Sequence, residues 1–150
     1  MAGMEFISKS IENTKKFAGE FLNELPKNGK RASVVGLHGS LGAGKTAFVQ
    51  CVAEILGVDE HVTSPTFVIL KNYKLQTKNY KLLIHIDAYR LTKGEELQKL
   101  GFGELLSNPQ NLIFVEWPEH VKEALPTDYT KLHFEFVDET TRRIQFGIKN

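Results

Sequence analysis

The sequence has little of several features that would define a special class of protein. It contains one cysteine, Cys51, which excludes an internal disulfide and a cysteine-rich metal site and fits a reducing cytosol. No apolar run approaches the roughly 18 residues of a membrane span. No basic segment followed by an apolar stretch opens the chain, so we expect no secretory signal. The resulting expectation is a cytoplasmic protein without membrane contact.

Charge of one sign is not in excess either. Lys and Arg number 19 against 18 Asp and Glu, which leaves a formal charge of +1. Because a protein that binds nucleic acid directly usually has a large basic excess, that class is disfavoured. The 41% of apolar and 25% of charged residues are instead typical of a packed globular protein. Since there is no repeat and no linker-like segment, we expect residues 1–150 to form a single domain.

Three segments have apolar residues at the three- and four-residue spacing of a helix. They are residues 8–25, residues 45–56 and a short region at 95–106 that is interrupted at Gly101 and Gly103. Ser8 or Ser10 is a plausible N-cap for the first helix, because a serine hydroxyl accepts a hydrogen bond from a free backbone N–H of the first turn.

Short apolar runs at 32–37, 82–86 and 112–115 are typical of strands that are covered on both faces. Residues 67–75 look extended and turn back through 76–79 into the second of these strands. Alternating apolar residues between 132 and 148 predict a terminal antiparallel hairpin. Strands that alternate with helices predict an α/β fold with a mostly parallel central sheet.

A glycine-rich segment follows the first buried strand and opens the second helix. Gly39-Ser-Leu-Gly-Ala-Gly-Lys-Thr46 fits G-x-x-x-x-G-K-[ST] at every fixed position. Its glycines allow successive N–H groups to point at an anion, and the positive end of the helix adds to the attraction. Lys45 would reach the β- and γ-phosphates, and the Thr46 hydroxyl would be a magnesium ligand. The expected nucleotide contacts in this segment are Ser40, Leu41, Gly42, Ala43, Gly44, Lys45, Thr46 and Ala47.

Two carboxylates stand at the carboxyl ends of the other buried strands, where α/β sheets place their ligand sites. Asp87 ends the run at 82–86, and Glu116 ends the run at 112–115. One of the two should hold Mg²⁺ and the other should orient the attacking water. The sequence leaves open which carboxylate has which role. Asp87 and Glu116 are therefore both predicted as metal ligands, and both are predicted as catalytic residues together with Lys45.

Other residues near these motifs are weaker candidates. Thr66 lies in the loop after the second helix, where switch-like segments of other phosphate-loop proteins sense the γ-phosphate. Trp117 directly follows Glu116 and either packs on the nucleotide or fills a gap. Arg90 is a possible charge-neutralising group. His85, inside a buried strand, is more often a hydrogen-bonded core histidine than a ligand.

Signatures of several nucleotide-binding classes are missing. The sequence has neither Asn-Lys-x-Asp, which disfavours a standard GTPase, nor Leu-Ser-Gly-Gly-Gln, which disfavours a transporter-type ATPase. A small-molecule kinase needs an arginine-bearing lid and an acceptor pocket. The chain is short for both and has only four arginines, which are Arg31, Arg90, Arg142 and Arg143.

The motifs taken together resemble the TsaE family, small bacterial ATPases of tRNA threonylcarbamoyladenosine (t6A) synthesis. The resemblance rests on the segments 39–46, Ser64-Pro-Thr-Phe67, His85-Ile-Asp-Ala-Tyr-Arg-Leu91, Glu95-Glu-Leu97 with Gly101, and Val115-Glu-Trp-Pro-Glu119. It implies the three-layer sandwich of P-loop NTPases, with a mostly parallel central sheet and a C-terminal antiparallel hairpin. The family commonly has an acidic residue after the first glycine of the phosphate loop, where this chain has Ser40.

The resemblance also implies an activity and partners. TsaE proteins bind ATP and Mg²⁺, hydrolyse ATP slowly alone, and associate with the TsaD–TsaB heterodimer, which modifies the adenosine at tRNA position 37. Hydrolysis is thought to reset that complex between turnovers, so contact with tRNA would be indirect. Carried over to this chain, Lys45 and Thr46 contact phosphate and magnesium, Asp87 and Glu116 are the acidic pair, and Trp117 and Thr66 lie beside the nucleotide. The alternatives are a nucleotide-gated adaptor without obligatory hydrolysis and a small-molecule kinase.

Overall fold

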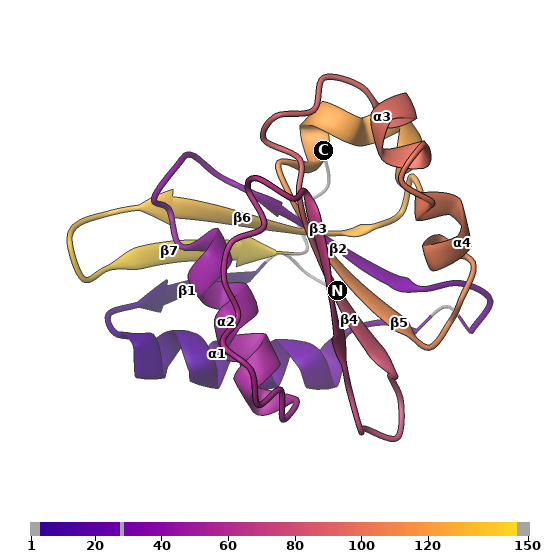
Figure 1. Ribbon diagram of the computed structural model, residues 1–150. Coiled ribbons are helices and arrows are strands. Elements are labelled where there is room, and N and C mark those ends of the chain that lie inside the picture. The colour runs from indigo at the N-terminus through magenta and orange to yellow at the C-terminus, as the bar shows by residue number, and fades with distance from the viewer. Residues whose placement is uncertain (1–3, 28, 147–150) are drawn as a thin grey trace.

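The computed structural model describes residues 4–27 and 29–146, in which seven strands form one sheet (Figure 1). The strands lie in the order β1-β7-β6-β2-β5-β4-β3. Their bounds are β1 (Met4–Ser8), β2 (Ser33–His38), β3 (Leu70–Lys74), β4 (Leu82–Asp87), β5 (Asn111–Glu116), β6 (Thr130–Phe136) and β7 (Arg142–Phe146). The helices are α1 (Ile11–Glu24), α2 (Lys45–Ile55), α3 (Gly94–Gln98), α4 (Phe102–Leu106) and the 3₁₀ helix η1 (Pro118–Ala124).

The sheet is mixed, with a parallel core. The four central strands β6, β2, β5 and β4 run parallel, whereas the pairs β1–β7, β6–β7 and β3–β4 are antiparallel. The prediction of a mostly parallel central sheet with a C-terminal antiparallel hairpin is therefore confirmed in part: the core is parallel and the β6–β7 hairpin is present, but both edges are antiparallel, so the whole sheet is mixed. On one side the short connection between β3 and β4 allows only a hairpin. On the other side β1, which the sequence did not predict, pairs along β7 from Met4↔Phe146 to Ser8↔Arg142.

Apolar residues of the sheet alternate between two clusters, one on each face. Helices α1 and α2 cover one face, where Phe17, Phe21 and Phe48 pack on one another at ring-centroid distances of 5.8–6.2 Å. Phe17 and Phe21 also pack on Phe146 of β7, at 5.8 and 5.9 Å. Helices α3, α4 and η1 cover the other face, as Figure 1 shows. Because side chains alternate along a strand, Leu83 of β4 belongs to the first cluster and Ile84 to the second.

Several predicted element ends change in the structure. Helix α1 begins at Ile11 with Ser10 as its N-cap, and the Ser10 side chain accepts a hydrogen bond from the Asn13 N–H at 3.0 Å. Ser8 belongs to β1, so it is not the cap. The helical region after residue 94 is divided at Gly101, as predicted, but Gly103 lies inside α4. Among the described residues, no helix is long and apolar enough to cross a membrane.

Two loop regions also differ from prediction. Residues 67–69 form a turn instead of continuing an extended segment, and β3 begins only at Leu70. The turn requires a positive φ of 72° at Ile69. The 3₁₀ helix η1 was not predicted, since it follows Trp117, which has a left-handed backbone (φ 60°) that the sequence does not signal. The terminal hairpin is confirmed for β6 and β7, whereas Ile148 lies outside the described residues.

Candidate functional site

The glycine-rich segment connects β2 to α2 at the carboxyl edge of the parallel strands. Two of its glycines are required by the geometry. Gly39 has a φ of 147°, and a Cβ there would lie 2.6 Å from the Phe134 carbonyl oxygen, so no larger residue fits. Gly44 has a φ of 106° and is the N-cap of α2, which has no side-chain hydrogen bond at this position. The first turn of α2 therefore keeps backbone N–H groups available for an anion.

Lys45 lies folded back over this loop. Its Nζ donates to the Gly39 carbonyl oxygen at 2.5 Å and sits 3.5 Å from the centroid of the Trp117 ring. The residue is only 4% exposed. Burial lowers the pKa of Lys45, and the negative charges of Glu116, Glu119 and Asp87 oppose that shift. The ammonium group is thus held inside the loop, beside the carboxylates.

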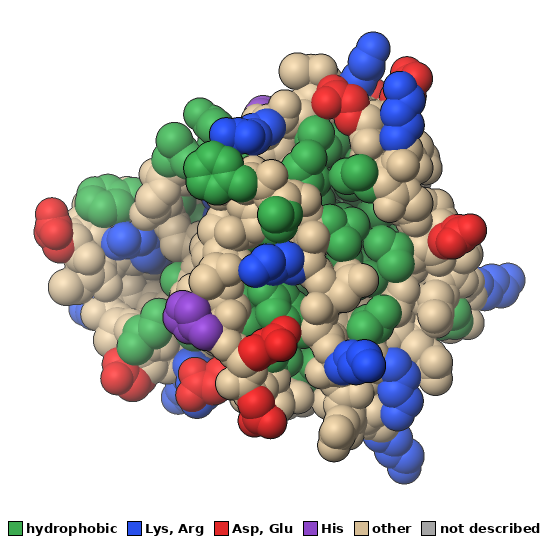
Figure 2. Space-filling view, in the orientation of Figure 1, with side chains coloured by type: hydrophobic (Ala, Val, Ile, Leu, Met, Phe, Trp, Pro, Cys, Tyr) green, Lys and Arg blue, Asp and Glu red, His purple; other side chains and the backbone are tan. Residues whose placement is uncertain are grey.

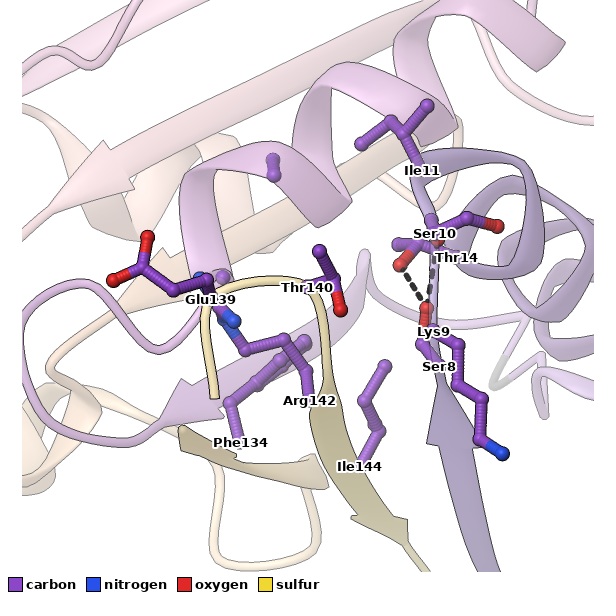
Figure 3. Close-up of a pocket in the computed structure, with 12 residues that line it drawn as sticks. Ser8, Lys9, Ser10, Ile11, Thr14, Phe134, Glu139, Thr140, Arg142 and Ile144 are labelled. Carbon is purple, nitrogen blue, oxygen red and sulfur yellow. Dashed lines mark hydrogen bonds between the residues drawn. The ribbon is translucent and has the colours of Figure 1, made fainter. Parts of the chain in front are cut away.

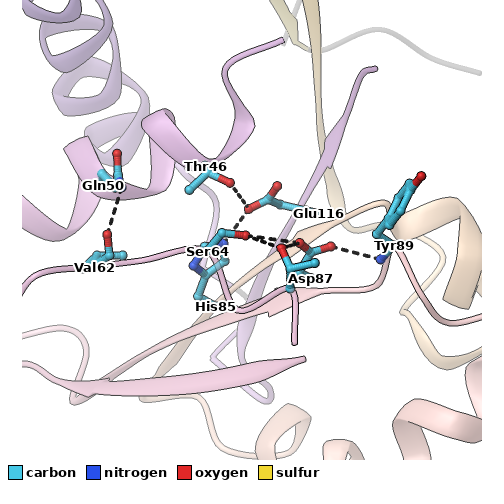
Figure 4. A network of polar contacts seen from close by, with 9 residues as sticks. Thr46, Gln50, Val62, Ser64, His85, Asp87, Tyr89 and Glu116 are labelled. Carbon is cyan, nitrogen blue, oxygen red and sulfur yellow. Dashed lines mark hydrogen bonds and ion pairs between the residues drawn. The ribbon is translucent and has the colours of Figure 1, made fainter. Parts of the chain in front are cut away.

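Glu116 connects the end of β5 to the phosphate loop (Figure 4). The Thr46 hydroxyl donates to Glu116 Oε2 at 2.8 Å, and His85 Nε2 lies 2.7 Å from the same oxygen. Glu116 is 3% exposed and His85 is fully buried. The structure therefore joins the first turn of α2, β4 and β5 through one carboxylate oxygen. His85 is a hydrogen-bonded core histidine, as expected, and its partner is a predicted site residue.

Asp87 connects the end of β4 to the loop before β3. Its Oδ2 accepts a hydrogen bond from the Thr66 hydroxyl at 3.0 Å and a longer one from the Ser64 hydroxyl at 3.4 Å. Its Oδ1 accepts from the Tyr89 backbone N–H at 3.0 Å. The loop is held along α2 as well, since Gln50 donates to the Val62 carbonyl oxygen (Figure 4). Thr66 thus connects this loop directly to Asp87.

These groups surround one cavity of about 420 Å³. Of the predicted site residues, ten line it: Leu41, Gly42, Gly44, Lys45, Thr46, Ala47, Thr66, Asp87, Glu116 and Trp117. The other two do not, because Ala43 is fully buried in the core and Ser40 is exposed outside the lining. Two exposed apolar side chains form what we call the rim: Leu41, which lines the cavity and is 68% exposed, and Phe67, which follows the lining residue Thr66 and is 80% exposed. Figure 2 shows apolar side chains at the surface over these loops.

Arg142 is the lining residue that the sequence reasoning missed. It begins β7, and its side chain lies 3.6 Å from where a Cβ on Gly44 would stand. No local signal marks it, since only the pairing of β7 with β6 and of β6 with β2 brings it to the phosphate loop. Arg90, by contrast, does not line the cavity; its guanidinium lies 4.6 Å from the centroid of the Phe67 ring.

His38, which comes directly before the loop, is not among the residues that line the cavity. His38 Nε2 lies 3.0 Å from the Tyr129 hydroxyl, and the ring stacks on His133 at 4.7 Å. Burial lowers the pKa of His38 to about 4, so the ring is neutral near pH 7. Within 4–27 and 29–146, no group of three or more His, Cys, Asp or Glu side chains is placed to hold a metal ion.

A second cavity, of about 350 Å³, adjoins the phosphate loop on the side of β1 and the β6–β7 hairpin (Figure 3). It shares Gly44, Ala47 and Arg142 with the first cavity. Figure 3 shows Ile11, Ile144 and Phe134 around it, with Thr140 and Glu139 of the hairpin turn. The two cavities therefore meet at the start of α2.

A phosphate-loop motif between a buried strand and a helix, with carboxylates at neighbouring strand ends, defines a P-loop protein of the α/β class. Comparison with known sequences then identifies the family. The sequence model of "Threonylcarbamoyl adenosine biosynthesis protein TsaE" matches residues 8–144, and the chain belongs to the TsaE family. Membership of this family implies nucleotide binding and a place in t6A tRNA modification.

Individual relatives agree with this assignment. The tRNA threonylcarbamoyladenosine biosynthesis protein TsaE of Rickettsia felis is 39% identical over 91% of this chain and 75% of its own length. The protein of that name in Aquifex aeolicus is 37% identical over 94% of this chain and 93% of its own length. The crystal structure of Bacillus subtilis YdiB is similar with a TM-score of 0.71 and 29% identity, covering 96% of this chain and 84% of YdiB.

Proposed function

We propose that this chain is a single-domain, Mg²⁺-dependent ATPase that serves t6A synthesis. The observation that carries the proposal is the contact of Thr46 with Glu116 at 2.8 Å, inside a cavity that also contains Lys45 and Asp87. A phosphate loop alone supports nucleotide binding. A carboxylate beside the hydroxyl of that loop, with a second carboxylate one strand away, supports hydrolysis as well.

The residues of the cavity fit Mg²⁺ by their chemistry. The Thr46 hydroxyl and the Glu116 carboxylate are hard oxygen donors, and magnesium bound to a nucleotide takes few protein ligands. We therefore assign Thr46 and Glu116 to the metal and Asp87 to the attacking water. When bound, Mg²⁺ would withdraw charge from the phosphate oxygens. Lys45 would contribute a positive charge from within the loop. Asp87 would accept a hydrogen bond from the attacking water and so orient it toward the phosphate.

The second cavity is the place we propose for the nucleoside part of ATP. It shares Gly44, Ala47 and Arg142 with the phosphate cavity, and its lining includes the apolar side chains of Ile11 and Ile144 (Figure 3). A flat base packs on such walls, and the polar groups of the hairpin turn can contact its edge. If Ile144→Ala weakened ADP binding no more than a distant core substitution of equal size, this assignment would be wrong.

The proposed partner is a TsaD–TsaB heterodimer, which would bring the tRNA. The formal charge of +1 supports indirect contact with tRNA, because direct binding usually needs a basic surface. The exposed Leu41 and Phe67 at the rim of the cavity support contact with a protein in the cytoplasm. The test is ATP hydrolysis by the purified chain with and without the heterodimer. Stimulation and co-elution are expected, and the absence of both would contradict the partner assignment.

The loop at residues 63–66 gives some support to the alternative of a nucleotide-gated adaptor. Since Thr66 donates to Asp87, a change at the phosphates can alter this loop and thereby the rim. The two functions differ in whether hydrolysis is needed. A variant that binds ATP but cannot hydrolyse it should stop after one round of t6A formation if the ATPase cycle operates. Repeated rounds with that variant would instead favour the adaptor.

A further inference from the structure

A buried histidine lies directly behind the Glu116 carboxylate. His85 is 0% exposed, and its Nε2 is 2.7 Å from Glu116 Oε2. Because an ionised carboxylate only accepts hydrogen bonds, the imidazole donates here and Nε2 carries the proton. The other ring nitrogen, Nδ1, is buried without a hydrogen-bond partner. Among the described residues, Glu116 is therefore the one polar partner of this ring.

The position of His85 in β4 makes its polarity unusual. Its neighbours Leu83, Ile84 and Ile86 are all fully buried apolar residues. An apolar side chain at position 85 would complete that pattern without leaving a ring nitrogen unpaired in the core, which is costly. What distinguishes the histidine from its neighbours is the hydrogen bond to Glu116 (Figure 4).

We propose that His85 is a positioning residue that holds the Glu116 carboxylate in the orientation needed for the metal. The hydrogen bonds from His85 and Thr46 both use Oε2, and neither uses Oε1. The carboxylate is thus hydrogen-bonded to one residue of β4 and to one residue of α2, and it cannot rotate without breaking both bonds. The inference rests on the proposed function, since it concerns the Mg²⁺ site of Thr46 and Glu116.

Four variants distinguish the proposed positioning role of His85 from a role in core packing alone. A glutamine side chain can place an N–H donor where the imidazole has Nε2, whereas an asparagine is one methylene shorter and cannot reach. His85→Gln and His85→Asn thus differ in reach while both bury an amide. His85→Leu removes the donor, and Leu83→Val changes packing on the same face of β4 without a contact to Glu116. Thermal unfolding of each variant establishes which are folded.

The single tryptophan supplies a readout that does not depend on turnover. Trp117 is the only tryptophan in the sequence, and the centroid of its ring lies 3.5 Å from Lys45 Nζ. Its fluorescence should change when ADP enters the phosphate loop. ADP is titrated first with EDTA present, and the ADP complex is then titrated with MgCl₂. The Mg²⁺ concentration at half-saturation is compared with the Mg²⁺ dependence, KM and kcat of ATP hydrolysis.

His85→Asn and His85→Leu should bind ADP in EDTA within about twofold of the unmodified chain but need about 10- to 100-fold more Mg²⁺. Their kcat should fall with little change in KM, and His85→Gln and Leu83→Val should stay close to the unmodified chain. If His85→Leu does not fold, the Gln and Asn variants still decide. Equal Mg²⁺ dependence in folded Gln and Asn variants would overturn the role of His85. An unmodified chain without Mg²⁺-dependent fluorescence or turnover would instead overturn the ATPase proposal itself.

Discussion

Asp87 and Glu116 end neighbouring parallel strands and are partners in the register of β4 and β5, yet their surroundings differ. Glu116 is bound by Thr46 of the phosphate loop and by the buried His85. Asp87 is bound by Thr66 and Ser64 of a surface loop and by a backbone N–H. Two carboxylates at equivalent positions of the sheet thus have different surroundings, because different segments of the chain pack against the two strand ends. The Glu116 carboxylate is hydrogen-bonded to the first turn of a helix, and the Asp87 carboxylate is hydrogen-bonded to a surface loop.

The largest effect should come from the Glu116 side. Glu116→Gln keeps the shape of the side chain but removes the negative charge that we assign to the metal. We expect ATP hydrolysis to fall by about 10³-fold, with a much higher Mg²⁺ requirement. Steady-state hydrolysis at a series of MgCl₂ concentrations measures both. An unchanged Mg²⁺ requirement would transfer the metal role to Asp87 and reverse the comparison.

The Asp87 side should give a smaller loss of a different kind. Asp87→Asn retains an oxygen that can accept from Thr66 but loses the carboxylate that would orient the water. We expect hydrolysis to fall by about 10²-fold while the affinity for Mg-ADP stays within a few-fold. Trp117 fluorescence gives the affinity and phosphate release gives the rate. A variant that loses both together would show that the two carboxylates act as one metal site.

Changes in the loop should be smaller again. Thr66→Val removes the 3.0 Å hydrogen bond to Asp87 and keeps the branched shape, so hydrolysis should fall roughly tenfold. The matched variant is Ser64→Ala, whose bond to Asp87 is longer, at 3.4 Å, and it should change the rate by only about two- to threefold. If the order of the two variants is reversed in the rate measurements, the loop contacts Asp87 differently with ATP bound.

Substitutions of the aromatic residues beside the two strand ends should have the smallest effects, and these effects concern ADP binding. Trp117 follows Glu116 and packs on the Lys45 ammonium, whereas Tyr89 packs on the Trp117 ring at 5.1 Å. Trp117→Leu should weaken ADP binding roughly two- to fivefold, because it removes a cation–π contact, and Tyr89→Leu should weaken it less. Calorimetry is the suitable measurement since the fluorescent residue is lost. Unchanged or tighter binding in Trp117→Leu would mean that Lys45 leaves the ring when phosphate binds.

The sequence predicted those helices and strands whose own residues show a clear pattern of apolar side chains. The helical spacing of apolar residues predicted α1 and α2, and the continuous apolar runs predicted β2, β4 and β5. Short edge elements were harder. β1 has a half-exposed pattern with Met4 and Ile7 at the surface, and it becomes a strand only because β7 offers a free edge. The same dependence on a partner explains why the whole sheet is mixed, with antiparallel strands at both edges of a parallel core.

The phosphate loop was the part of the site that the sequence alone determined. Its eight residues are contiguous, and the backbone angles that glycine permits are a local property, so the motif and its place between a strand and a helix could be read directly. The positions of Asp87 and Glu116 at strand ends also followed from the apolar runs before them, since a buried strand tends to end where a charged residue reaches solvent or a ligand.

Only the tertiary structure decided how these groups are related. Residues 46, 85 and 116 meet because β4 and β5 are neighbours and α2 packs over them, and no local pattern sets that order. The difference between Asp87 and Glu116, the role of His85 and the approach of Arg142 to Gly44 all arise in this way. Hydrogen bonds between residues tens of positions apart depend on which strands pair, and strand pairing is settled by the packing of the whole sheet.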